Sequence, residues 1–76
     1  MVIAYILATV KSGTEKDVVD AMKKEPRVKE AHLLYGEFDV IAKIELQSIS
    51  DLSDFILDHI RGIPQIERTA TLIVAG

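Results

Sequence analysis

Hydrophobic and polar residues follow different periods along this chain, and the changes of period divide it into short segments. Val2–Val10 is rich in β-branched and aromatic residues and is followed by a polar, glycine-containing stretch over residues 11–13, which predicts a strand and then a turn. Apolar residues then recur at helical spacing from Thr14 until Pro26, which cannot continue a helix. We expect the hydroxyl of Thr14 to cap the first turn of this helix.

After Pro26 the pattern predicts two strands, a second helix and a last strand. Val28–Leu34 has the pattern of a strand, and Phe38–Leu46 has that of another, with apolar residues at alternate positions. Residues 49–51 predict an apolar staple residue and a polar cap at the start of a second helix, which Gly62 ends. Ile66–Ala75 is the last predicted strand.

The predicted order of elements is β-α-β-β-α-β with short connections. Right-handed crossovers then give an α+β protein of the ferredoxin-like type, a four-stranded antiparallel sheet with two helices on one face. We expect residues 1–76 to form a single domain, because a chain of this length has room for one hydrophobic core.

The sheet face without helices is the first indication of an assembly. The first strand is apolar on both sides, with Ile3, Tyr5 and Leu7 on one face, and residues 72–74 of the last strand are also apolar throughout. An antiparallel sheet with a wet face normally shows clean alternation, although single apolar residues on a surface are common. We therefore predict a homodimer that packs sheet on sheet, a dimeric α+β barrel.

Composition and charge exclude several classes of function. The net charge is −3 and the nine basic residues are scattered, so direct binding of nucleic acid is disfavoured. The absence of cysteine excludes disulfides and thiolate metal sites. The apolar start of the chain is too short to span a bilayer and no basic segment precedes it, so we expect a soluble, cytoplasmic protein with no membrane partner.

Residues able to carry catalysis are few. His32 and His59 have no neighbour at metal-ligand spacing, and residues 12–13 lie in neither a phosphate-binding nor a dinucleotide-binding fingerprint. We expect His32 to be a cross-strand polar partner and His59 to lie at the edge of the buried stripe of its helix. The sequence thus predicts no catalytic residue, no metal site and no cofactor, and we expect a protein that is not an enzyme.

The stretch YGEFD, residues 35–39, is the best candidate for a ligand site. Gly36 can adopt positive φ and leave backbone N–H groups free to face an α-carboxylate. The carboxylate of Asp39 can accept from an ammonium group, and Tyr35 and Phe38 can wall an apolar side chain. A purely structural interpretation also remains open, in which Gly36 makes the turn, Phe38 fills the core and Asp39 caps the hairpin.

The run EPRVKEAHLLYGEFDVIAKIEL, with its surroundings, resembles the effector-binding domain of the leucine-responsive/asparagine regulator (Lrp/AsnC) family of prokaryotic transcription factors. The family pattern places P-x-V and then G-x-x-D between the second and third strands, and T-x-T before an apolar stretch in the last strand. The matching residues here are Pro26 and Val28, Gly36 and Asp39, and Thr69 and Thr71. Gln65 stands where the family usually has glycine, in a turn outside the expected pocket.

The resemblance implies an assembly and a ligand. Family members form sheet-on-sheet dimers that join into rings, commonly octamers, and bind an amino acid or a related effector between neighbouring dimers. Carried over to this chain, the resemblance implies that the ligand-binding residues are Tyr35, Gly36, Glu37, Phe38, Asp39, Thr69 and Thr71.

One part of the family pattern has no counterpart in this sequence, the N-terminal helix-turn-helix domain. We therefore expect a stand-alone effector-binding module, of the kind called a RAM domain. Such a module would sense an amino acid by itself or co-assemble with full-length Lrp/AsnC regulators, without binding DNA directly.

Two alternatives from other classes remain open. A small monooxygenase or isomerase of the dimeric α+β barrel group would enclose a cavity of a few hundred Å³ beneath the helices. An ACT-like regulatory domain would place its ligand on the loop after the first strand, at residues 12–14. An RNA-binding domain needs exposed aromatic and basic residues on the third strand, where this chain has only Phe38, and we set it aside.

Overall fold

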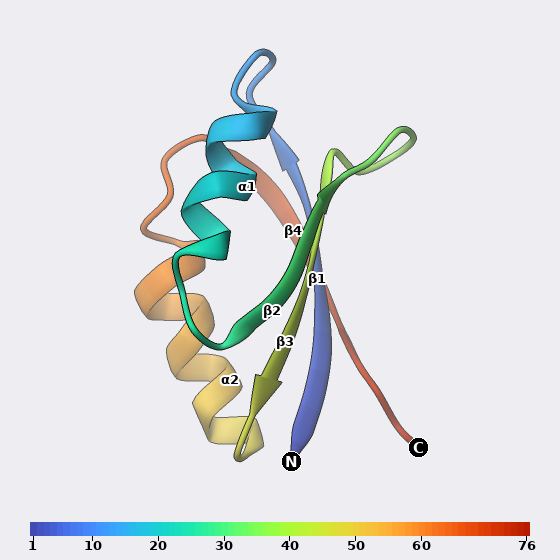
Figure 1. The fold of residues 1–76 in the computed structure, drawn as a ribbon, viewed down its shortest axis with the longest axis vertical. Helices are drawn as coiled ribbons and strands as arrows, with labels where there is room; N and C mark the ends of the chain where they lie inside the picture. The colour runs from blue at the N-terminus through green and yellow to red at the C-terminus, as the bar shows by residue number, and fades with distance from the viewer.

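The structure is a computed structural model that describes all residues from 1 to 76, and it confirms the ferredoxin-like fold. The sheet has the strand order β2-β3-β1-β4, and each pair of neighbouring strands is antiparallel. Both helices lie on one face of this sheet (Figure 1). The elements are β1 (Val2–Val10), α1 (Glu15–Lys23), β2 (Val28–Leu33), β3 (Val40–Leu46), α2 (Ile49–Phe55), a π-helical segment η1 (Ile56–Ile60) and β4 (Ile66–Ile73).

The hydrophobic core lies between the helices and the two central strands. On β1, Ala4, Ile6 and Ala8 are completely buried, and the register places each opposite a residue of β3 that is also buried. The alternation of buried and half-buried residues along both strands follows from the period of two in a pleated strand. The helices complete the core with Val18, Val19, Met22, Leu52 and Phe55.

The start of α1 differs from its prediction. Thr14 occupies the cap position, but its hydroxyl donates to the carbonyl oxygen of Lys11 at 2.6 Å and bonds to no N–H of the helix. Its backbone angles, φ −107° and ψ 4°, depart from the extended conformation that points a capping oxygen at the first turn. The predicted cap by Thr14 is therefore wrong.

The second helix begins earlier than predicted, and its cap is Ser48. Ser48 has extended backbone angles, φ −150° and ψ 168°, and its hydroxyl oxygen accepts from the N–H of Asp51 at 3.3 Å. The cap thus precedes residues 49–51, and Ser50 lies inside α2. The helix continues as η1, in which the N–H of Arg61 donates to the oxygen of Ile56 at 3.0 Å. No helix in the structure is long and apolar enough to cross a bilayer.

The connection between β2 and β3 is longer than the predicted tight turn and covers residues 34–39. The N–H of Leu34 donates to the oxygen of Asp39 at 2.8 Å, while the N–H of Asp39 donates to the oxygen of Ala8 on β1 at 2.9 Å. Gly36 has φ +129°, which a residue with a side chain adopts only with strain. Because these bonds use backbone groups outside the ladder, β3 starts at Val40 and the connection projects beyond the sheet (Figure 1).

β4 forms one edge of the sheet and is left uncovered by the helices. It pairs with β1 alone, and apart from Ile66 and Ala70 its residues are exposed. The strand ends at Ile73, before the predicted end, although the N–H of Val74 still donates to the oxygen of Ile3 at 2.9 Å.

Candidate functional site

The open face of the sheet is apolar along its centre. Tyr5 lies opposite Leu72 on one side, and Leu7 lies opposite Ile41 on the other. Tyr5, Leu7 and Ile41 are only half-buried, and Leu72 is 55% exposed. No element of the chain covers this face, so side chains that favour burial remain in contact with water.

The loop of residues 34–39 forms a hollow with the start of α1. Tyr35 and Glu37 are exposed, whereas Phe38 and Asp39 are half-buried. Tyr35 and Asp39 line a hollow of about 350 Å³, which is completed by Glu15, Leu33 and Leu34. The structure thus brings two of the predicted ligand residues together on one side of the molecule.

Asp39 has a structural role in the single chain. One of its carboxylate oxygens, Oδ2, accepts from the N–H of Val10 at 2.9 Å. The pairing between β1 and β4 shifts register between Thr9 and Val10, and the carboxylate of Asp39 binds the chain at this irregularity. The aspartate therefore ties the loop to β1 and does not cap its own hairpin, and this bond engages one of its two oxygens.

Phe38 lies outside the core and pairs with β4. The guanidinium carbon of Arg68 is 5.3 Å from the centre of the Phe38 ring, within the range of a cation–π interaction. Arg68 is opposite Thr9 in the register, on the same face as Leu7. The interpretation that Phe38 fills the core is therefore wrong, because its ring meets an arginine at the edge of the open face.

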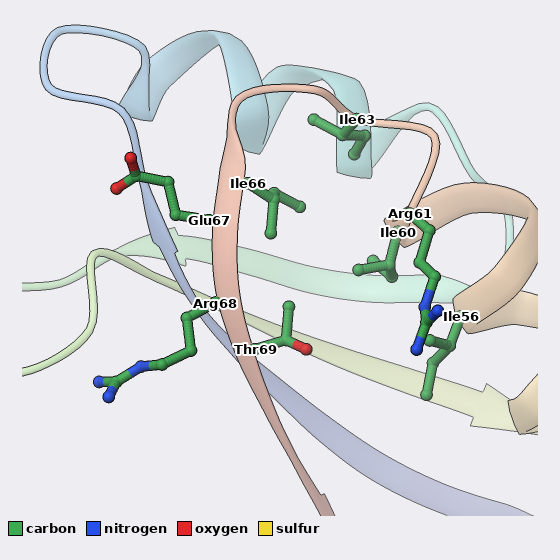
Figure 2. Close-up of a pocket in the computed structure, with 8 residues that line it drawn as sticks. All are labelled: Ile56, Ile60, Arg61, Ile63, Ile66, Glu67, Arg68 and Thr69. Carbon is green, nitrogen blue, oxygen red and sulfur yellow. The ribbon is translucent and has the colours of Figure 1, made fainter.

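Thr69 and Thr71 lie on the opposite face of the sheet from Arg68. They are opposite Ala8 and Ile6 of the core, but both are exposed because no helix covers β4. Thr69 lines a second hollow, of about 280 Å³, between β4 and the end of the second helix (Figure 2). The other lining residues are Ile56, Ile60, Arg61, Ile63, Ile66, Glu67 and Arg68.

A single chain does not bring the loop and the threonines together. Ala8 lies between them, since it pairs with Val40 beside the loop and with Thr69 on β4. Two strand spacings separate those positions, a distance of about 10 Å. Tyr35 and Asp39 consequently line one hollow and Thr69 another, while Thr71 lines neither of them.

The second hollow was missed by sequence reasoning. Three of its isoleucines, Ile56, Ile60 and Ile66, lie within the predicted second helix and last strand, and Arg61 was not singled out. Ile63 carried a usable signal, since it lies between the end of the helix and Pro64 and had no predicted place in the core. An apolar residue in such a turn indicates that the turn packs against the hydrophobic core, as Ile63 does.

A cluster of charged and aromatic side chains joins the end of α1 to η1. The Arg27 side chain donates from Nε to Glu25 at 2.8 Å, and Nε2 of His59 lies 3.1 Å from the other oxygen of Glu25. The hydrogen bond from Arg27 lowers the pKa of Glu25, and the same bond raises the pKa of Arg27. His59 also stacks on Phe55, with ring centres 5.4 Å apart, which confirms its predicted place at the edge of the buried stripe.

His32 does not pair across the sheet as predicted. Its Nε2 lies 3.3 Å from the carboxylate of Glu30, two positions earlier on the same strand, and the residue opposite it on β3 is Ile41. Both members of this pair are more than half exposed, so the contact is a surface one.

The two alternative sites have less support from the geometry. All 16 buried residues are apolar, and they fill the space between sheet and helices where an enzyme of the dimeric barrel type would hold its pocket. In the turn of residues 12–14, the N–H of Gly13 donates to Glu15 at 3.1 Å and the hydroxyl of Thr14 donates to Lys11. Groups that an ACT-like site would offer to a ligand are thus engaged within the turn.

Comparisons with known proteins point to one family. Residues 3–75 match the family described as the Lrp/AsnC ligand binding domain. The HTH-type transcriptional regulator FL11 of Pyrococcus horikoshii is 36% identical over 72 residues, which cover 95% of this chain and 47% of that regulator. The chain therefore spans about half the length of the curated regulators that it matches.

Solved structures agree with this assignment. The hypothetical protein PHS023 from Pyrococcus horikoshii superimposes with a TM-score of 0.95 and 41% identity, covering 99% of this chain and 90% of that one. AsnC of Escherichia coli superimposes with a TM-score of 0.92 and 26% identity, covering 99% of this chain and 51% of that one.

Proposed function

Because this chain belongs to the Lrp/AsnC ligand-binding domain family, we propose that it senses a small effector, an amino acid, and regulates transcription through the chains with which it assembles. The relatives it matches are named as transcriptional regulators and not as enzymes. The observation that carries the proposal is that three predicted ligand residues line two separate hollows of one chain, Tyr35 and Asp39 the first and Thr69 the second.

The first step of assembly is a homodimer through the open face of the sheet. Tyr5, Leu7 and Ile41 form its half-buried centre, and the more exposed Leu72 extends it onto β4. Packing two such faces removes their apolar surface from water, at about 25 cal/mol for each Å² buried. This burial adds a large share to the stability of a chain of 76 residues, since the core of a single chain is small.

The second step joins dimers and completes the ligand site. A ligand that contacts both Asp39 and Thr69 needs these groups from two chains, because within one chain they line different hollows on either side of β1. A ring of dimers, such as an octamer, would place the loop of one dimer against the β4 hollow of the next. The site would then include all seven predicted residues, Tyr35, Gly36, Glu37, Phe38, Asp39, Thr69 and Thr71.

The loop offers groups that suit one end of an amino acid. Oδ2 of Asp39 accepts from Val10, and the second oxygen, Oδ1, can accept from an α-ammonium group. Tyr35 projects fully into solvent, where it can contact a neighbouring chain or the ligand held there. Asp39 can therefore hold the loop on β1 with one oxygen and bind the ligand with the other.

Transcriptional control would act through full-length regulators. FL11 aligns with this chain over about half of its length, so a heterodimer through the same sheet face would pair this domain with the matching part of a regulator subunit. The effector bound between dimers would then change how many regulator subunits the assembly contains.

Native mass spectrometry of the purified chain, alone and with a mixture of the twenty amino acids, tests the proposal. We expect multiples of a dimer that gain one amino acid for each chain. Thr69→Val should weaken the adduct, because Thr69 lines the β4 hollow, whereas Ser12→Ala, which removes an exposed hydroxyl on the turn favoured by an ACT-like site, should leave it unchanged. A bare dimer without any adduct would contradict the sensor function, and loss of the adduct in Ser12→Ala alone would favour the ACT-like alternative.

A further inference from the structure

The hollow between η1 and β4 has a chemical character that defines the class of ligand. Ile60 is buried, and Ile56, Ile63 and Ile66 pack half-buried against the core, so four isoleucines give the cavity an apolar wall (Figure 2). Its volume of about 280 Å³ lies below the range typical of drug-sized ligands. A small aliphatic group is the kind of occupant that such a wall accommodates.

Arg61 adds a positive charge to this apolar wall. Its side chain runs along the cavity towards Ile56, whereas Glu67 and Arg68 extend away from it (Figure 2). Arg61 takes part in none of the four ion pairs of the chain, which involve other residues. A guanidinium with no carboxylate partner beside an apolar wall is suited to hold the carboxylate of a ligand through two parallel hydrogen bonds.

Thr69 supplies a hydroxyl on the opposite side of the same hollow. It is exposed, and its side chain forms no hydrogen bond within the chain. Arg61 and Thr69 come from different elements and face the cavity from its two sides (Figure 2). Both can donate to one carboxylate whose attached side chain lies on the isoleucines.

We propose that this hollow binds an α-amino acid with an uncharged aliphatic side chain, with Arg61 as the anchor of its α-carboxylate. The proposal rests on the proposed sensor function and narrows its ligand. The isoleucine wall holds the side chain, and the α-ammonium group faces the free oxygen of Asp39 from a neighbouring chain. Cationic amino acids are disfavoured, because their side chains would lie beside the positively charged guanidinium of Arg61.

Titration calorimetry of the full chain separates the carboxylate contact from the rest of the site. The two probes are L-leucine and L-leucinamide, which differ only in the carboxylate, and the two variants are Arg61→Gln and Lys24→Gln. We expect the unmodified chain to bind L-leucine about 10- to 100-fold more tightly than the amide, the usual range for a charge-assisted pair. Arg61→Gln should reduce this ratio to near one, because it should weaken the binding of L-leucine and leave the binding of L-leucinamide unchanged.

Lys24→Gln is the control, because this cation is exposed at the end of α1 and lines neither hollow. It should leave the ratio between the two probes unchanged. Arg61 is exposed and its side chain has no hydrogen bond in the chain, so Arg61→Gln should melt at the same temperature as the unmodified protein. An unchanged ratio in Arg61→Gln would overturn the anchor even if L-leucine still binds.

A second titration tests the class of side chain. L-Leucine should bind at least about 10-fold more tightly than L-lysine and L-aspartate, since a charged group on the isoleucine wall loses its hydration without a matching partner. Tighter binding of either charged amino acid would overturn the aliphatic class while leaving the sensor function intact. Absence of binding by all three would overturn both.

Discussion

At the scale of single residues, the carboxylate of Glu25 contacts two residues, Arg27 and His59, that are distant from each other in sequence. It accepts from Arg27 at the start of the second strand segment and lies 3.1 Å from His59 of η1. Arg27 in turn lies over the Phe55 ring, with 5.1 Å between the guanidinium carbon and the ring centre. The carboxylate of Glu25 therefore links the connection before β2 to η1 in the helix layer.

Glu25→Gln should lower the free energy of unfolding by about 1 kcal/mol at pH 7, since a charge-assisted and partly buried hydrogen bond is lost. The pKa of Glu25 is lowered in the folded chain, so its carboxylate stabilises the fold above the unfolded value of 4.5. This contribution is lost as the pH falls through the folded pKa, which lies below 4.5. Urea unfolding of both chains at pH 7 and pH 3, at one protein concentration, measures the difference.

Glu30→Gln is the control for this prediction. Its carboxylate also lies near a histidine and a lysine, but its side chain is 55% exposed, so the change should stay within about 0.5 kcal/mol. A Glu25→Gln difference that is absent at pH 7, or that is as large at pH 3, would show that the ion pair does not stabilise the fold.

At the scale of elements, the boundaries of α2 depend on geometry that the residue pattern does not contain. Both Ser48 and Ser50 are good capping residues, and Asp51 suits the first turn after either of them. The chain leaves β3 in extended conformation at Ser48, and this directs the Ser48 hydroxyl at the N–H of Asp51. Periodicity predicts that the helix exists, while the exit angle of the preceding strand decides which serine caps it.

Ser48→Ala should destabilise the protein by about 1 kcal/mol, because the N–H of Asp51 loses its side-chain acceptor. Ser50→Ala, inside the helix, should cost at most a few tenths of a kcal/mol, since alanine has the higher helix propensity. Urea denaturation followed by circular dichroism compares the two. Equal losses in both variants would place the cap at neither serine.

The π-helical segment is a second feature of this scale that the pattern did not reveal. Ile56 and Ile60 are spaced as in an ordinary helix, so the apolar stripe gives no sign of the wider turn. Such turns are frequent at functional sites, and η1 contributes Ile56 and Ile60 to the hollow beside β4.

At the scale of the whole molecule, the proposed homodimer forms through the open face of the sheet. Leu72→Glu should weaken the homodimer by at least about 100-fold in Kd, because each copy would bury an unpaired carboxylate between the sheets. The single chain should tolerate this change, since Leu72 is already 55% exposed. Sedimentation equilibrium measures the dissociation constant.

Leu57→Glu is the matched control for the assembly prediction. Leu57 is 59% exposed, but it lies on η1 in the helix layer, on the other side of the molecule from the open face. Its substitution should leave the dimer constant unchanged. If Leu57→Glu dissociates the dimer and Leu72→Glu does not, the dimer forms through the helices.

The sequence by itself determined the order of the elements, the helix-covered face of the sheet and the apolar character of the other face. These properties follow from periodicity and side-chain chemistry, which act over a few neighbouring residues and therefore show in a linear pattern. For the same reason the loop of residues 35–39 could be singled out as unusual, and its glycine does adopt positive φ.

Only the tertiary structure decided how the candidate site is divided. The strand order β2-β3-β1-β4 sets the loop and Thr69 on opposite sides of β1, and it gives Asp39 a partner in Val10 that lies 29 positions away. The same packing brings Arg61 and four isoleucines from two elements and a turn around one hollow. Such neighbours are set by long-range pairing of strands and docking of helices, which depend on the energy of the whole chain and leave no local periodic signal.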